Sequence, residues 1–296
     1  MAMRESERRR EYEVVSLHEI KGRAPKIFGI PSGVEGLDSL FFTVEIRNGE
    51  VKKIPLGGYP YLSVMNLTGI ADTGKSLMAE QFAVKQASLG YRVCFVTVET
   101  PKEFIVQSLR YRASAMGISI ENIDKNIFII DCATNQGLRE NLNDLLDTLA
   151  YAIREYGIKS VVIDSVTGLY EAKEVMARVI VRKVYNFMKK WRQTCLMVSQ
   201  KRSSSEELTA EAAGGYGVAH IVDGTIVLYK KLIQSKFDVS TYGLPLGSII
   251  RLMRIDGCRM TGHDTRTFIF EITDTGLVRI MAPLNEYIKR VGGKLR

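Results

Sequence analysis

Residues 69–76 read Gly-Ile-Ala-Asp-Thr-Gly-Lys-Ser, so two glycines precede a Lys-Ser pair at a fixed spacing. Glycine lets the backbone turn so that its N–H groups point into one concavity, where they can bind the oxygens of a polyphosphate. Lys75 can then reach the β- and γ-phosphates, and the hydroxyl of Ser76 can coordinate Mg²⁺. The pattern predicts a phosphate-binding loop made of Gly69, Ile70, Ala71, Asp72, Thr73, Gly74, Lys75, Ser76 and Leu77.

The segments on either side of this loop are the ones that would position it. Residues 61–67 suit a strand that enters the loop, and residues 76–89 place apolar side chains at helical spacing before Gly90, which suits a C-cap. The amino end of that helix would face the phosphates, where its partial positive charge helps to hold them. Strand, loop and helix together predict a nucleotide-binding site.

An acidic residue ends a second apolar run. Asp164 follows the run 160–163, which has the composition of a buried strand. In proteins with such a phosphate loop, an Asp in this position lies beside Mg²⁺ and holds it directly or through water. Ser76 and Asp164 are therefore the expected metal ligands. The alternative for Asp164 is a helix N-cap or a turn residue.

Two more expected strands end in polar side chains. Glu99 follows the run 93–98, and its carboxylate could orient or deprotonate an attacking water. The alternative is a surface Glu that opens the next helix, where an acid suits the helix dipole. Gln200 follows the run 194–198, and its amide could sense a γ-phosphate; the alternative is an ordinary strand end. The catalytic candidates are Glu99, Lys75 and Gln200.

One histidine stands among cationic residues. His263 lies in MTGHDTR with Arg259 and Arg266 on either side, and this group could meet a phosphate, including one bound by a neighbouring subunit. The alternative is a charged hairpin turn. His220, in VAHIVDG, is flanked by apolar residues and is expected in the core.

Composition limits the class of protein. The 296 residues are 46% hydrophobic, which allows one large α/β domain with a substantial core. No apolar run approaches the roughly 18–20 residues of a membrane span, and the charged first residues contain no apolar signal region, so we expect a cytoplasmic protein with no membrane segment. The cysteines are widely spaced and are expected to be free thiols: Cys94, Cys132, Cys195 and Cys258.

The net charge of +8 and the pI near 9.2 are compatible with binding of nucleic acid or of a nucleotide. The long polar segment 201–217 contains more glutamates than basic residues. That balance argues against strong contact with a phosphate backbone through this loop. DNA binding is therefore possible and not favoured.

We expect the chain to divide into a charged N-terminal extension (1–25), one domain (26–282) and a C-terminal tail (283–296). Alternating residues around Asn48-Gly49 predict an inserted β-hairpin at about 41–56. Strands are expected at 92–98, 127–131, 160–164 and 194–199, with helices at 102–116, 137–156 and 175–191 between or beside them. This alternation predicts a mainly parallel sheet covered by helices on both faces. Antiparallel strands without intervening helices are expected at one edge, at 221–229, 248–254 and 267–272.

These features together resemble the RecA superfamily and, within it, the KaiC-like ATPases. The resemblance covers most of residues 27–280. The chain departs from the family pattern at one position: a single glutamate, Glu99, stands where the family commonly has two consecutive glutamates. The matching segments are the lead-in 29–38, Gly57-Gly58-Tyr59-Pro60, the phosphate loop, 95–101, 163–165, 216–224 and the stretch from Leu252 through His263 to Ile272.

The resemblance implies a RecA-like core, ATP with Mg²⁺, and a homo-oligomer, expected as a hexameric ring with nucleotides between subunits. The family's basic finger would map onto Arg251 or Arg254, with Arg266 also open, so Arg254 and His263 join the nucleotide-binding candidates. The expected function is a hydrolysing ATPase that acts as a regulatory or signalling switch. The alternatives are a DNA-binding recombination or repair ATPase of the RecA or RadA paralogue type, and a nucleotide-dependent scaffold that does not hydrolyse.

Overall fold

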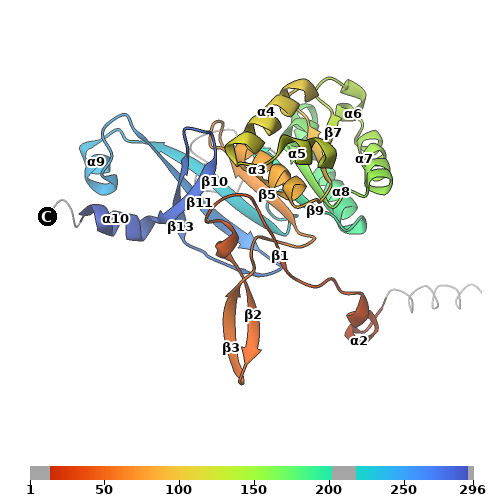
Figure 1. Ribbon diagram of the computed structural model, residues 1–296, viewed down its shortest axis with the longest axis horizontal. Helices are drawn as coiled ribbons and strands as arrows, with labels where there is room; N and C mark the ends of the chain where they lie inside the picture. Colours follow the sequence, from red (N-terminus) through yellow and green to blue (C-terminus); the bar gives the residue numbers. More distant parts are fainter. Residues whose placement is uncertain (1–13, 202–217, 293–296) are drawn as a thin grey trace, which may run out of the picture.

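Figure 1 shows the computed structural model, which describes residues 14–201 and 218–292. A nine-stranded sheet forms its centre, in the order β14-β13-β11-β10-β5-β9-β8-β6-β7. The strands are β5 (Val64–Gly69), β6 (Val93–Thr97), β7 (Ile127–Asp131), β8 (Ser160–Asp164), β9 (Thr194–Gln200), β10 (Gly224–Leu232), β11 (Ile249–Cys258), β13 (Thr267–Ile272) and β14 (Val278–Pro283). The strands from β10 through β5 to β7 pair in parallel, and β10, β11, β13 and β14 pair antiparallel. The predicted mainly parallel sheet with an antiparallel edge is confirmed.

Helices cover both faces of this sheet (Figure 1). Successive residues of a strand point to opposite faces, so Met65 and Leu67 of β5 join the core under α3, whereas Val64 joins the core on the other side, where α7 and α8 pack. The helices are α3 (Lys75–Ser88), α4 (Lys102–Ala115), α5 (Ile120–Asn126), α6 (Gln136–Glu140), α7 (Leu142–Tyr156), α8 (Ala177–Lys190), α9 (Lys236–Tyr242) and α10 (Leu284–Gly292).

The long helix expected at 137–156 is two helices. Asn141 separates α6 from α7 with an extended backbone (φ −106°, ψ 97°), and its side chain accepts the N–H of Asn143. Asn favours such caps because its amide competes with the helical hydrogen bond. The expectation of no helix between the late strands was also wrong: α9 follows β10 and begins with a capping box between Ser235 and Asp238.

The predicted hairpin is confirmed. β2 (Phe41–Arg47) and β3 (Glu50–Pro55) pair antiparallel around Asn48 and Gly49, which both have positive φ (54° and 79°). Two residues with positive φ are what a tight type I′ hairpin turn requires. A short strand, β12 (Gly262–His263), adds to β2 as a third strand. Figure 1 shows the hairpin projecting away from the sheet and its helices.

Two of the segments discussed above, the charged N-terminal extension and the long polar segment, are described only in part. Residues 1–13 of the charged extension and residues 202–217 of the polar segment lie outside the described residues. Within the described part, Leu17–Ile20 form the short helix α2, and no helix is long and apolar enough to cross a membrane. Cys94, Cys132 and Cys195 are buried and Cys258 is partly buried, all as free thiols.

A buried ion pair fastens the antiparallel edge to α3. Arg112 of α4 lies 3.1 Å from Glu80 of α3, and their side chains are only 5% and 7% exposed. Arg112 also donates to the carbonyl of Gly276 in the turn between β13 and β14, and Ser108 donates to Glu80 at 2.6 Å. Because α3 begins in the phosphate loop, this network ties that turn to the helix that carries Lys75.

Replacing Arg112 with methionine is expected to lower the free energy of unfolding by about 3–5 kcal/mol, because the carboxylate of Glu80 would stay buried without its partner. Urea unfolding measures the change. The matched control is Arg110→Met, two residues earlier on the same helix, whose pair with Asp124 is 46% and 42% exposed. That control should cost no more than about 1 kcal/mol. Equal losses in the two variants would contradict the prediction.

Candidate functional site

The phosphate loop and the predicted strand-end residues meet at one edge of the sheet. β5, β9, β8 and β6 are consecutive and parallel, so their carboxyl ends share this edge. Gly69, at the end of β5, is in register with Gln200 on β9, and Thr97, near the end of β6, is in register with Asp164 on β8. The structure therefore brings the loop, Glu99, Asp164 and Gln200 together. Ligand sites in open α/β sheets lie in this position.

The glycines of the loop are required by its shape. Gly74 has φ 92°, in the left-handed region that favours glycine. A Cβ at Gly69 would lie 2.4 Å from the carbonyl oxygen of Leu228, so no larger residue fits there. The loop is closed by Thr73 and Lys75, which both donate to the carbonyl of Ile70, at 2.9 and 2.6 Å. These contacts fold the side chain of Lys75 back over the loop that would bind the phosphates.

Burial lowers the pKa of Lys75 to about 8, although the carboxylates of Asp164 and Glu99 oppose the shift. Bound phosphates would raise this pKa again, because their negative charge favours the ammonium form. Nucleotide binding should therefore take up a proton at any pH between the pKa of Lys75 in the free protein and its pKa with phosphates bound. At such a pH the phosphate group is already fully ionised, so Lys75 is the group that gains the proton.

We expect ATP binding to take up most of one proton at about pH 9 and almost none at about pH 7, where Lys75 is mainly protonated before binding. Isothermal titration calorimetry in buffers of different ionisation enthalpy measures this uptake. The measurement at the lower pH is the control within the same protein. A binding enthalpy at the higher pH that does not depend on the buffer would contradict the prediction.

Asp164 lies beside the loop, where Ser76 hydrogen-bonds to its carboxylate. Burial is the main cause that raises the pKa of Asp164 to about 6, and the nearby carboxylates of Glu99 and Glu80 add to it. Ser165, not Asp164, occupies the N-cap position of the following 3-10 helix (Val166–Leu169), so the structure does not support the capping alternative.

The donors around Asp164 fit Mg²⁺ held together with phosphate. Across residues 14–201 and 218–292, no group of three or more His, Cys, Asp or Glu side chains could hold a metal by itself. Mg²⁺ needs no such cage, since it is usually bound by one or two carboxylates, substrate phosphates and water. Ser76 and Asp164 suit that mode, and a cation there would relieve the charge of the buried carboxylate.

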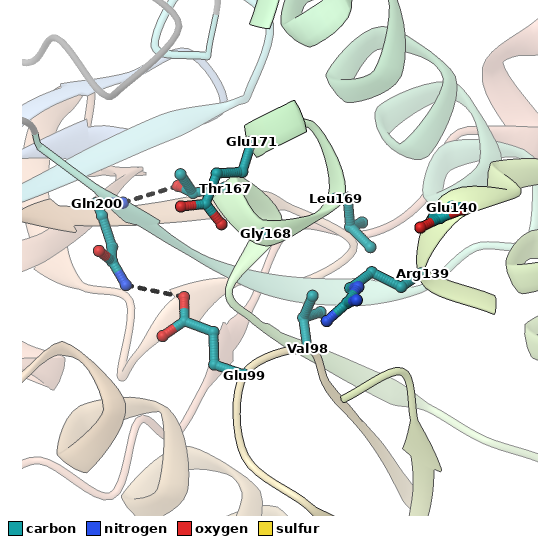
Figure 2. A pocket seen from close by; sticks show the side chains of 9 residues that line it. All are labelled: Val98, Glu99, Arg139, Glu140, Thr167, Gly168, Leu169, Glu171 and Gln200. Atoms are coloured by element: carbon teal, nitrogen blue, oxygen red, sulfur yellow. Dashed lines mark hydrogen bonds between the residues drawn. The ribbon is translucent and has the colours of Figure 1, made fainter. Parts of the chain in front are cut away.

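Glu99 is held by two donors. Its Oε1 accepts from Nε2 of Gln200 at 2.8 Å (Figure 2). The same oxygen accepts from Oγ of Ser165 at 2.5 Å. The backbone N–H of Gln200 in turn donates to Oγ1 of Thr167 at 2.9 Å. α4 begins only at Lys102 with Pro101 as its N-cap, so Glu99 does not open that helix.

These side chains border a cavity of about 670 Å³ at the carboxyl edge of the sheet. Figure 2 shows Glu99 and Gln200 on one side of it, with Arg139 and Glu140 opposite and Glu171 above. Three of the lining residues are acidic and one is basic. The cavity therefore has a net negative lining at the place where Glu99 would meet water.

One predicted nucleotide contact, His263, does not lie at the loop of its own chain. His263, on β12, lines a second cavity of about 540 Å³, together with His220, Asp256 and Arg259. The expectation that His220 lies in the core was wrong, because this histidine is exposed. This cavity borders the start of β10, where Gly224 is in register with Met65 near the start of β5, whereas the phosphate loop follows the end of β5. The reason is the antiparallel pairing of β11 with β10, which carries the chain from Arg251 back to the opposite edge. Arg254 lies between these two ends, in register with Val227 and through it with Thr68, and forms an ion pair with Asp256 at 2.7 Å.

The structure separates the candidate arginines. Arg251 lies 4.0 Å from Asp72 and so belongs to its own phosphate loop, where Lys230 also pairs with Asp72 at 2.9 Å. Arg266 is held by Asp264 and Glu286. Arg259 borders the same cavity as His263 and donates to the carbonyl of His220. The sequence analysis grouped Arg259 with His263 and Arg266 as a contact for a phosphate, but did not count Arg259 among the candidates for the arginine supplied in trans.

Comparisons with known proteins agree with this geometry. The sequence model of the family described as "ATPase: KaiC" matches residues 30–285. UPF0273 proteins from Aeropyrum pernix and Thermotoga maritima are each 28% identical to the chain, which they match over 84% of its length and over 92% and 94% of their own.

The circadian clock oscillator protein KaiC of a Picosynechococcus species is 26% identical over 76% of this chain and 42% of its own length. The crystal structure of a KaiC-like protein from Pyrococcus horikoshii has the same fold, with a TM-score of 0.63, 22% identity, and coverage of 87% of this chain and all of that one. Because the family model spans most of the sequence, including the phosphate loop and both cavities, the chain is a single RecA-like domain and belongs to the KaiC ATPase family.

Proposed function

We propose that this protein hydrolyses ATP with Mg²⁺. The observation that carries the proposal is the carboxylate of Glu99, which Gln200 and Ser165 hold at the strand ends that also carry the phosphate loop and Asp164. The loop and Lys75 would bind the phosphates, and Ser76 and Asp164 would hold the metal, which supplies charge neutralisation at the phosphates. Glu99 would orient and deprotonate the attacking water.

The site would be completed by a second subunit. Arg259 and His263 lie at the end of β5 opposite the phosphate loop, so they are too far along the sheet to serve their own nucleotide. Head-to-tail contact between copies would place them at the nucleotide of a neighbour, and repeated head-to-tail contacts form a ring where the rotation between copies closes. We propose a homo-oligomeric ring, expected as a hexamer, with Arg259 as the arginine supplied in trans.

Hydrolysis would act as a regulatory or signalling switch through Gln200. Its side chain holds Glu99, and its backbone is held by Thr167, so loss of the γ-phosphate would change contacts at the end of β9. The contacts of Gln200 with Glu99 and Thr167 would then respond to the nucleotide state. This is a coupling of two conformations to one ligand, as in other phosphate-sensing loops.

The alternative of a DNA-binding recombination ATPase has the net charge of +8 in its favour. The cavity at the carboxyl edge opposes it, because Glu99, Glu140 and Glu171 outnumber Arg139 in its lining. Phosphodiesters approach such a surface unfavourably. The alternative of a scaffold that binds ATP without hydrolysing it depends on whether Glu99 can activate water as a single glutamate, where the family commonly has two.

Steady-state ATP hydrolysis tests the proposal, measured with Mg²⁺, with Mg²⁺ chelated, and with added single-stranded DNA. We expect turnover that requires Mg²⁺ and does not respond to DNA. Strong stimulation by DNA would favour the recombinase alternative. Tight binding of ATP with no turnover under any of these conditions would leave the scaffold.

A further inference from the structure

The β2–β3 hairpin has one apolar and one charged face. Directly opposite residues of an antiparallel pair point to the same side, and the register pairs Val44 with Lys53 and Ile46 with Val51. Val44, Ile46 and Val51 therefore share a face, and they are 66%, 78% and 70% exposed. Lys53 lies on the same face, with its ammonium 3.2 Å from the centroid of the Phe42 ring near the base of the hairpin. The other face carries two pairs of opposite charge: Glu45 with Lys52 and Arg47 with Glu50.

This distribution differs from what a hairpin in water requires. A two-stranded hairpin is marginally stable by itself. Exposed β-branched side chains stabilise it only modestly, through cross-strand pairs such as Ile46 with Val51. Contiguous apolar surface on a projecting element typically marks a contact with another macromolecule. Figure 1 shows that the hairpin stands clear of the rest of the chain, so its own domain does not cover this face.

The base of the hairpin is joined to the segment that carries Arg259 and His263. His263 pairs with Phe41 and Gly262 with Phe42, and the N–H of Asp264 donates to the carbonyl of Leu40 at 2.8 Å. Phe41 is fully buried. The hairpin and residues 262–264 thus form one three-stranded unit, and a molecule that contacts His263 also lies next to the base of the hairpin.

We propose that the apolar face made by Val44, Ile46 and Val51 binds a second copy of this chain, in the contact that brings Arg259 and His263 to its nucleotide. The inference rests on the proposed ring and adds the surface that holds the ring together. A second copy is favoured over another protein because the hairpin continues the surface that the proposed function already directs at a neighbouring subunit. The hairpin of one copy meets a different surface of the next, which is the head-to-tail contact that a ring requires.

The test compares a triple variant, Val44→Ser, Ile46→Ser and Val51→Ser, with a control from the opposite face, Glu45→Ser and Lys52→Ser. The control removes one directly opposed charge pair and leaves the net charge unchanged. Multi-angle light scattering over a range of concentrations, with ATP and Mg²⁺, measures the assembly midpoint. We expect the triple variant to raise that midpoint on the order of 100-fold, since three apolar side chains lose their burial, and the control to assemble like the wild type.

Hydrogen exchange on the wild-type protein provides a second measurement that needs no variant to fold. Amides of residues 42–53 should become protected as the concentration passes the assembly midpoint. A wild-type oligomer with neither this protection nor sensitivity to the triple substitution would overturn the hairpin contact while leaving the ring in place. A wild-type protein that stays monomeric with ATP at every concentration would overturn both the contact and the ring.

Discussion

Replacing Arg259 with alanine is expected to lower kcat by about 10³–10⁵-fold, the size of effect that an arginine contributes to a transferring phosphoryl group from a neighbouring subunit. The expectation follows from placement: Arg259 shares a cavity with His263, away from the phosphate loop of its own chain. The matched control is Arg254→Ala, which removes an arginine of the same strand region that pairs with Asp256. We expect kcat of that control to change less than about tenfold, since its charge is already compensated.

Mixing two inactive variants shows whether Arg259 acts across subunits. Lys75→Ala disables a phosphate loop and keeps Arg259, whereas Arg259→Ala keeps the loop. In a random mixed ring, about a quarter of the sites would combine an intact loop with an intact arginine from the neighbour. Activity should therefore return on mixing. Full activity of Arg259→Ala alone, or no recovery in mixed rings, would show that Arg259 does not serve a neighbouring site.

Replacing Glu99 with glutamine is expected to lower kcat by about 10²–10⁴-fold while ATP binding is retained, because the amide keeps the shape of the side chain and cannot accept a proton. Oε1 of Glu99 accepts from Gln200 and Ser165, so the carboxylate is oriented before any substrate binds. Steady-state hydrolysis and equilibrium binding of ATP, measured on the same preparation, separate the loss of chemistry from the loss of binding.

Glu140→Gln is the matched control for Glu99. Glu140 borders the same cavity from α6, and its carboxylate accepts a hydrogen bond from Gln136. Its replacement makes the same change of charge in the cavity without touching the strand end, and its kcat should stay within about threefold of the wild type. Equal losses in the two variants would mean that the charge of the cavity, not the base at Glu99, controls the rate.

The effects of Arg259 and Glu99 would be separable in one experiment. A Glu99→Gln subunit should still supply Arg259 to its neighbour, so mixing it with Arg259→Ala should also restore sites that have an intact Glu99. The two residues lie at opposite edges of one sheet and belong, in the proposed ring, to different active sites.

The sequence by itself determined the parts whose chemistry is local. The phosphate loop requires glycine and lysine at a fixed spacing, and short apolar runs that end in Glu99, Asp164 and Gln200 predict strands that end at one edge. The hairpin follows from Asn48-Gly49, because only such residues adopt two successive positive φ angles at low cost. Periodicity missed the break at Asn141, where the side chain competes with the helical backbone bond.

Only the tertiary structure decided which residues that are distant in sequence act together. Arg251, Arg254, Arg259 and Arg266 all lie within one basic stretch, and the sequence could not separate them. The antiparallel pairing of β11 with β10 places Arg251 at the phosphate loop and Arg259 at the opposite end of the sheet. The pairing of Glu99 with Gln200, which are 101 residues apart, likewise depends on strand order and register. Local sequence specifies the backbone shape of each element, whereas the packing of the whole chain sets the register that brings side chains together.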